Sequence, residues 1–504
     1  MIRTHVAAEP AIYYSSEIGR SPLSDFYDAV DAAVGDWEVL VRPLHSGFSR
    51  SMGRPTDLVL YVKMFLVAYF QNAVYDTQLC ALCADSMSIR RFLGLTLVDA
   101  VPDHSSISRI RKSFGQCPAL ASTLEQVVSR CVKAGLVAGR SVHVDATLVR
   151  ANASINSLCS LDSDRSVDEH LKEARQNGEK LAVKNSEFYS PGDPASRIRK
   201  KRSDKPMMCY TGVHVTDSAN QVIVSARMDY GDAPEVAASL PAIRQAQARL
   251  EEMGESLEVV VADKGYDSVE FHQGIEEMGL TPATFYARNI QEEGRFGRSE
   301  FEFDAERNVY VCPLGKELSY RGQKGPQLAY VSKTSDCKFC PFRDMCLGKK
   351  AVRKEISRMP GEEASERNRA FVSTPEGKRH LRARSSTVEP AFGHMKRYGG
   401  LERISCQGLP QAEVKLIFAA VGWNIKKLIK SAASGAKVRL NKRNPAPDAP
   451  QTALKGSAGS IGHGLGRLER LLGRLLTAYR ALRGHIALRK VAQSRGQLPA
   501  GAKR

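Results

Sequence analysis

Apolar residues recur at helical spacing through the first 140 residues. Between residues 57 and 70 they lie three or four positions apart, which is the period of one helix face. A similar pattern over 120–134 stops at Gly135, a residue that commonly ends helices. We therefore predict an all-α N-terminal domain over residues 1–140.

A basic helix is expected inside this domain. Asp103, or a serine just after it, offers an N-cap, and the helix that follows carries Arg109 and Arg111. It can be read as a recognition helix whose arginines contact phosphates. The alternative is a helix used for packing or dimerisation.

The pattern changes to strand at residue 141, where Val142 and Val144 alternate with polar residues. Residues 152–202 are polar and predict a long loop with one helix. This loop ends in a dense basic run that includes Lys200, Lys201 and Arg202. Such a run is usually a solvated surface, but beside a site that cuts DNA it would contact phosphates.

Two strands are predicted over 210–217 and 221–229, joined by a turn. A helix over Pro241–Met253 follows, with the proline in its first turn, and then a buried apolar strand over 257–262. This order predicts an α/β domain, a mixed sheet flanked by helices.

The remaining sequence divides by composition. Residues 264–380 break the regular pattern and carry a cysteine cluster, so we interpret them as an insert within a domain spanning 141–430. Residues 381–430 return to helical spacing. Residues 431–504 read as a basic linker followed by an amphipathic, arginine-rich helix.

Composition narrows the class of protein. A chain of 504 residues predicts two or three domains. It has no apolar stretch near the roughly 20 residues of a membrane span and no secretory signal pattern, so we expect a cytoplasmic protein, associated with the nucleoid if it binds DNA. The net charge of +18 fits a polyanionic partner or simply a soluble basic protein, and most of it lies in 431–504, which hold fifteen Lys/Arg against two acids.

Two aspartates follow apolar strands. Asp145 comes after Val142 and Val144, and Asp263 closes the strand at 257–262. We place both at the carboxyl edge of one sheet, where open α/β sheets carry their sites. A single aspartate at such a place is most often a turn or cap residue, but a pair supplies the hard oxygen ligands that divalent ions need for phosphodiester chemistry.

Glu389 opens a further helical stretch. Lys396 lies seven residues later on the same helix face, where it would steady a phosphate beside a metal-bound carboxylate. The alternative is a capping box formed by Ser386 and Glu389. A cap at Thr387 suits Pro390 better, because it puts the proline in the first turn.

Three segments carry a resemblance to a known family. VHVDATLVRANAS, VVADKGYDS and STVEPAFGHMKR, in this order and spacing, resemble the catalytic blocks of insertion-sequence DDE transposases, and GRPTDLVLYVKMFLVAYF with VPDHSSISRIR resembles their N-terminal helical domain. The likeness covers about residues 40–430. It implies an RNase H-like catalytic fold, two Mg²⁺ or Mn²⁺ ions and recognition of terminal inverted repeats.

The resemblance assigns roles by position. Asp145, Asp263 and Glu389 match the metal-binding catalytic triad, and Lys396 matches the lysine after the glutamate. The family often has an arginine four residues before the glutamate. Here Ser385 holds that position and Arg384 lies one residue further back, which leaves a DNA-contacting role for Arg384 in doubt.

Four of the eleven cysteines cluster late in the chain. Cys337 and Cys340 form a C-x₂-C pair, Cys346 follows, and Cys312 lies upstream. In a cytosolic chain this grouping favours a metal over disulfides, and the spacing fits structural zinc or an iron–sulfur cluster. The alternative is that the cysteines are small packing residues. His104 and His394 could contact DNA but are more often structural.

The leading hypothesis is a DDE transposase that cleaves and joins DNA and works as a homodimer or larger assembly on its DNA ends. A second is an RNase H-like nuclease without strand transfer. A third is a non-enzymatic DNA-binding protein descended from a transposase. The N-terminal resemblance favours the first over the second, and the intact triad favours the first over the third.

Overall fold

A computed structural model describes residues 21–48, 56–162, 166–176, 183–200, 205–285, 296–348, 350–387 and 389–434. The tail predicted over 431–504 therefore lies outside the described residues beyond Ser434. The chain divides into two compact units. Unit 1 comprises 1–257 with 385–504, and unit 2 comprises 258–384.

The described elements before residue 134 are helical, as predicted. They are α1 (Pro22–Val34), α2 (Trp37–Val41), the 3₁₀ helix η2 (Arg42–Gly47), α3 (Leu58–Gln71), α4 (Asp76–Asp85), α5 (Met87–Leu93), α6 (His104–Gly115) and α7 (Leu120–Lys133). Asp103 caps α6, because its carboxylate accepts the backbone N–H groups of Ser105 and Ser106 at 2.8 and 2.9 Å.

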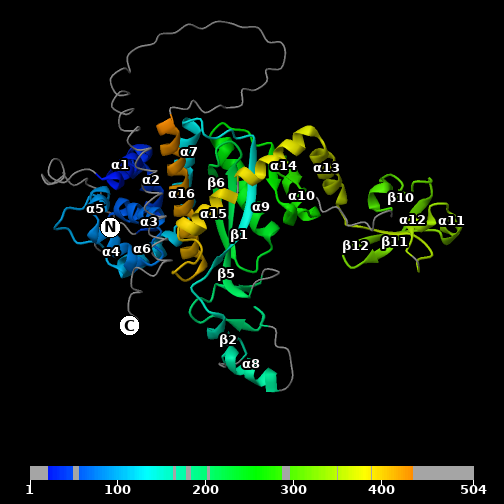
Figure 1. The fold of residues 1–504 in the computed structure, drawn as a ribbon, viewed down its shortest axis with the longest axis horizontal. Coiled ribbons are helices and arrows are strands. Elements are labelled where there is room, and N and C mark those ends of the chain that lie inside the picture. Colours follow the sequence, from blue (N-terminus) through cyan, green and yellow to red (C-terminus); the bar gives the residue numbers. More distant parts are fainter. Residues whose placement is uncertain are drawn as a thin grey trace, which may run out of the picture. The chain divides into compact units, whose positions relative to one another are not determined.

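These helices do not form a unit of their own. They pack against α16 (Leu409–Ser434), which runs beside them in Figure 1. The ring centroids of Phe418 in α16 and Phe65 in α3 lie 5.3 Å apart. The fit is close at Gly422 of α16, where an added Cβ would lie 2.3 Å from the ring of Tyr69. The N-terminal helices thus share one core with the rest of unit 1.

The sheet of unit 1 is antiparallel. Strand β5 (Met207–Asp217) lies between β1 (Ser141–Arg150) and β6 (Ile223–Tyr230), and β4 (Arg197–Arg199) pairs with the first residues of β5. Helix α16 runs along β6, where the Asn424 amide bonds both the N–H and the carbonyl of Ile223 at 2.8 Å.

The predicted hairpin of β5 and β6 is confirmed, whereas the start of the next helix is wrong. Helix α9 (Glu235–Glu252) packs against β5 and β6 and begins six residues before Pro241, which lies inside it. Val236 and Ala238 are buried on that earlier turn. Packing of these side chains outweighs the hydrogen bond that the proline cannot make.

The helix predicted within the polar stretch 152–202 is α8 (Val167–Gln176). The sequence did not indicate the short elements η3 (Ile155–Ser157), β2 (Cys159–Ser160), β3 (Phe188–Tyr189) and β4, of which β2 and β3 pair with each other.

Unit 2 begins with a parallel pair of strands. Strand β7 (Val259–Ala262) pairs with β8 (Thr281–Thr284), and η4 (Lys264–Tyr266) and α10 (Val269–Glu276) connect them. Val259, Val261 and Ala283 form a small core with Val372 of α13 (Glu362–Ser373). Helix α14 (Pro375–Thr387) follows and crosses the boundary between the units.

A second sheet in unit 2 carries the cysteines. Its strand order is β13-β12-β11-β10-β9, all antiparallel. The elements are η5 (Arg298–Glu300), β9 (Glu302–Asp304), β10 (Val309–Val311), β11 (Glu317–Lys324), β12 (Gln327–Ser332), α11 (Thr334–Lys338), α12 (Arg343–Cys346) and β13 (Glu355–Arg358). The irregular insert expected over 264–380 was drawn too wide, since α10, β8 and α13 are regular elements within it.

Among the described helices, none is by itself long and apolar enough to span a membrane. One bent pair, Leu58–Gln71 with Asp76–Asp85, passes on length and composition but turns by 98° at its break.

Candidate active site

Asp145 lies in the middle of a strand rather than at its end, which corrects the sequence-based placement. It is the fifth residue of β1, and the pairing with β5 continues to Arg150. The apolar alternation stops at Val144, so the sequence made the strand look shorter than the pairing makes it. Asp145 is half-buried, and its Oδ1 accepts the N–H of Ala146 at 3.0 Å.

The cross-strand neighbour of Asp145 links it to the helix that carries the predicted glutamate. His214 of β5 is directly opposite Asp145, and such pairs project from the same face of a sheet. The ring of Phe392, in α15 (Glu389–Tyr398), stacks on His214 with centroids 4.0 Å apart and planes 7° apart. Helix α15 therefore covers the sheet face from which Asp145 projects.

Burial determines the protonation state of the stacked histidine. His214 is fully buried, and the loss of solvent lowers the pKa of its imidazole to about 3. The ring is therefore neutral at physiological pH and acts as a flat apolar support for Phe392. Sequence reasoning missed His214; its only signal was a histidine within an otherwise apolar strand.

Glu389 stands at the first position of α15, one helical turn before Phe392. Its side chain lies outside the described part of the structure. Helix α14 ends at Thr387, so Pro390 is the second residue of α15. The choice between a cap at Thr387 and a capping box with Ser386 stays a prediction. Lys396 is half-buried further along the same helix, and its phosphate contact stays a prediction.

Asp263, in unit 2, lies directly after β7, as predicted. One of its oxygens caps the following turn, because Oδ1 accepts the N–H of Gly265 at 2.7 Å. The other, Oδ2, lies 3.7 Å from Nη2 of Arg384. The Asp263 side chain is 41% exposed, so its capping role leaves an oxygen open to solvent and to the arginine.

The basic residues predicted to contact DNA separate into distinct groups. Arg384 is 12% exposed and faces Asp263, so the structure gives it a carboxylate partner. Arg109 is exposed and bonds the Ser106 hydroxyl at 3.0 Å. Lys200 is exposed, and Lys201 and Arg202 lie outside the described residues.

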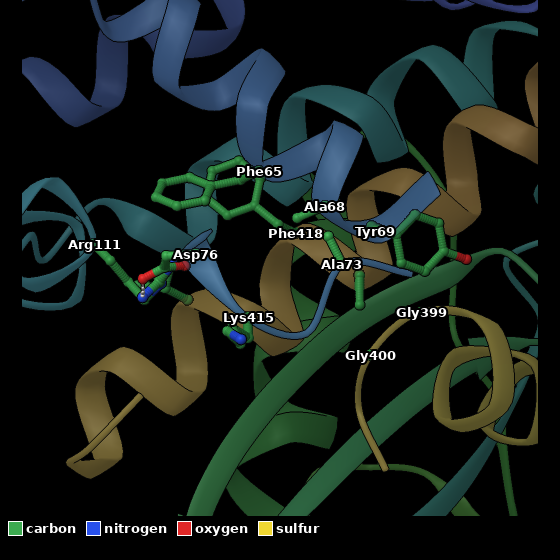
Figure 2. A pocket seen from close by; sticks show the side chains of 12 residues that line it. Phe65, Ala68, Tyr69, Ala73, Asp76, Arg111, Gly399, Gly400, Lys415 and Phe418 are labelled. Atoms are coloured by element: carbon green, nitrogen blue, oxygen red, sulfur yellow. Dashed lines mark hydrogen bonds and ion pairs between the residues drawn. The ribbon is translucent and has the colours of Figure 1, made fainter. Parts of the chain in front are cut away.

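The predicted DNA contact of Arg111 is wrong. Its side chain is 3% exposed and forms a two-pronged ion pair with Asp76, as Figure 2 shows. The pair borders a cavity of about 30 Å³, large enough for about one water, which the half-buried Lys415 also lines. A buried and paired guanidinium cannot reach a phosphate. Its spacing from Ile107 and Phe114 already placed it on the apolar face of α6.

The four clustered cysteines come together in unit 2. Cys312 follows β10, Cys337 lies in α11, Cys346 ends α12 and Cys340 lies between these helices. All four border one cavity of about 190 Å³. Over the described residues, no three acidic, histidine or cysteine side chains are yet gathered to hold an ion, and this applies to the aspartates as well.

The two histidines singled out from sequence differ in surroundings. His104 is exposed at the start of α6. His394 packs among aromatic rings, 5.2 Å from Tyr398 and 5.4 Å from Trp423. This packing is what a structural role for His394 would require, and a DNA contact by His394 stays a prediction.

Two segments of the chain match known protein families. Residues 311–429 match the family described as "Transposase DDE domain", and residues 17–113 match "Transposase domain (DUF772)". The first match contains Glu389 and the cysteine cluster, and the second covers most of α1 to α6. A search of curated proteins found no match.

Solved structures give distant similarities. A piggyBac transposase synaptic complex with hairpin DNA is 12% identical, with a TM-score of 0.33 and 88% of each chain covered. A Mos1 transposase paired-end complex with the left transposon end is 13% identical, with a TM-score of 0.16, covering 48% of this chain and 63% of that one.

Proposed function

Because the chain belongs to the insertion-sequence DDE transposases, we propose that it cleaves DNA at the terminal inverted repeats of its element and joins the freed ends to target DNA. The proposal assigns the chemistry to Asp145, Asp263 and Glu389. The observation that carries it is the stack of Phe392 on His214, which lays the helix of Glu389 over the sheet face of Asp145.

The order of elements supports an RNase H-like catalytic fold. Three antiparallel strands, β1, β5 and β6, are followed by α9, β7, α10 and the parallel β8. This is the mixed α/β arrangement that the family resemblance implies. Arg384, the partner of Asp263, lies five positions before Glu389 in the sequence.

The donor chemistry of the triad fits divalent Mg²⁺ or Mn²⁺, because carboxylate oxygens are the hard ligands these ions take. Asp263 keeps one oxygen clear of its backbone hydrogen bond, and Asp145 is half-buried beside the neutral His214. Two bound ions would stabilise the charge on the attacking and leaving oxygens of the phosphodiester.

The proposal gives the basic residues two roles, one toward the catalytic carboxylates and one toward DNA. Arg384 neutralises and orients Asp263, and Lys396 lies seven residues beyond Glu389 on the same helix, where its ammonium would contact the scissile phosphate. Arg109 and Lys200 are exposed and would contact the backbone of the DNA end. Holding two ends together requires a dimer or larger assembly, located with the nucleoid in the cytoplasm.

The proposal is tested with terminal-repeat DNA, a target plasmid and Mg²⁺. We expect Asp145→Asn, Asp263→Asn and Glu389→Gln each to reduce cleavage and strand transfer by at least about a thousandfold, while binding to the DNA end is kept. Matched controls are Asp162→Asn and Glu376→Gln, both exposed in the structure, which should act as wild type.

Full strand transfer by any of the three triad variants would contradict the assignment. Cleaved ends without joined product from the wild-type protein would instead identify a nuclease. Failure of the wild-type protein to bind terminal-repeat DNA would remove the transposase proposal altogether.

A further inference from the structure

Four thiols from separate segments surround one cavity in unit 2. Cys312 comes from the turn between β10 and β11, and Cys337, Cys340 and Cys346 come from the α11–α12 segment. The cavity measures about 190 Å³, so the thiols surround a space larger than one ion.

The backbone around Cys312 is arranged as a sulfur-binding turn. Gly315, with a φ of 72°, lets the chain reverse, and its N–H donates to the Cys312 carbonyl at 2.8 Å. The N–H of Lys316 then donates to Cys312 Sγ at 3.3 Å. Hydrogen bonds of this kind favour a thiolate, the form of cysteine that binds metal.

The charged residues that line the cavity are Lys316, Lys354 and Asp336, a net positive set. Lys354 is fixed there, because its ammonium donates to the carbonyls of Phe296 and Cys346 at 3.0 and 3.1 Å. A divalent ion with four thiolates carries a net charge of about −2, which these lysines offset in part.

The core of the five-stranded sheet is small. It consists of Phe301, Tyr310, Leu318, Tyr330 and Ile356, and the partly buried Phe296, Phe303, Cys312, Leu328 and Cys346 pack against it. Cores of this size rarely stabilise a small β-sheet without a covalent or metal cross-link. A metal between the β10–β11 turn and the α11–α12 segment would supply one.

We propose that Cys312, Cys337, Cys340 and Cys346 bind one structural zinc ion, which fastens the β10–β11 turn to the α11–α12 segment. Since no three of these thiols yet converge on one point, binding requires their side chains to turn into the cavity. Zinc accepts a tetrahedral set of thiolates at about 2.3 Å, which turning side chains can provide. The ion has no part in the proposed DNA chemistry.

The first test is elemental analysis of the full-length protein. We expect about one zinc per chain, and no zinc in the Cys337→Ser/Cys340→Ser double variant. Cys159→Ser is the matched control, because Cys159 is half-buried in unit 1 and outside the cluster, and this variant should keep its zinc. Zinc-free wild-type protein, or zinc retained in the double variant, would overturn the proposal. So would iron with acid-labile sulfide in place of zinc.

A second test needs no variant and so does not depend on a variant folding. Titration of the wild-type protein with a mercurial should release its zinc by the time six thiols per chain have reacted, the four of the cluster and the half-buried Cys80 and Cys159. Cys83 and Cys131 should not interfere, because burial raises the pKa of each thiol to about 12. Zinc that stays bound after the accessible thiols have reacted would contradict thiolate ligation. The outcome is independent of DNA cleavage, so it separates this proposal from the transposase assignment.

Discussion

Asp263 uses its two carboxylate oxygens differently. Oδ1 holds the turn after β7, and Oδ2 faces Arg384. The sequence could predict Asp263 because the apolar run of β7 ends abruptly before it. It could not predict the partner, because contacts between residues 121 positions apart leave no local pattern. For Arg111 the sequence-based prediction was wrong, because its charge suggested a surface role whereas its position in the helix faces the core.

Replacement of Arg384 should separate stability from activity. The pair with Asp263 is partly exposed, so Arg384→Gln should cost at most about 1 kcal/mol of unfolding free energy. Without the arginine, Asp263 loses its orienting charge, and we expect cleavage to fall by about tenfold or more at unchanged end affinity. Thermal unfolding and single-turnover cleavage measure the two effects, with the exposed Arg379→Gln as control. Unchanged cleavage would show that the pair has no positioning role.

Helix α15 is the element on which the candidate site depends. Its helical character was predictable from the apolar spacing of Phe392 and Met395. The residue on which α15 packs could not be predicted, because His214 lies in a strand about 180 residues earlier. The same limit applies to the five-stranded sheet, whose three-residue strands β9 and β10 are too short to show a period.

Weakening the stack of Phe392 on His214 should slow DNA cleavage without lowering the affinity for DNA. Phe392→Leu keeps an apolar side chain but loses ring stacking worth about 1 kcal/mol. We expect cleavage to slow by about tenfold with little change in the dissociation constant for terminal-repeat DNA. Tyr398→Leu, on the same helix but 36% exposed, is the control. A wild-type rate for Phe392→Leu would remove the stack as a positioning contact.

The close approach of α3 and α16 can be tested by comparing the unfolding free energies of variants at two helical glycines. A methyl group at Gly422 would overlap the Tyr69 ring, whereas one at Gly393 meets nothing within 4 Å. Gly422→Ala should therefore destabilise unit 1 by about 1–3 kcal/mol, and Gly393→Ala should be neutral or stabilising by up to about 1 kcal/mol. Denaturant unfolding compares them. Equal midpoints would mean that the helices do not approach as closely as described.

The whole chain divides differently from the sequence-based scheme. The predicted helical domain shares a core with the sheet of unit 1, and the boundary of unit 2 falls at residues 258 and 384. Apolar periodicity identifies helices but does not show which of them pack together. The strong charge of the tail, by contrast, is a property of composition and can be read directly from the sequence.

Removing residues 440–504 should change DNA binding more than catalysis. This segment holds thirteen Lys/Arg against two acids, so its loss lowers the net charge from +18 to +7. We expect weaker nonspecific binding with a shallower salt dependence and an unchanged cleavage rate at saturating DNA. Affinity measured over a range of salt concentrations, with single-turnover cleavage alongside, tests this. Loss of cleavage would assign the tail to the catalytic core.

The most direct test of the catalytic assignment is a crystal structure of the protein with terminal-repeat DNA and Mn²⁺. Anomalous scattering then locates each ion. The account predicts ions within about 2.5 Å of carboxylate oxygens from Asp145, Asp263 and Glu389 together. Ions bound elsewhere, or any of these three carboxylates remote from them, would contradict it.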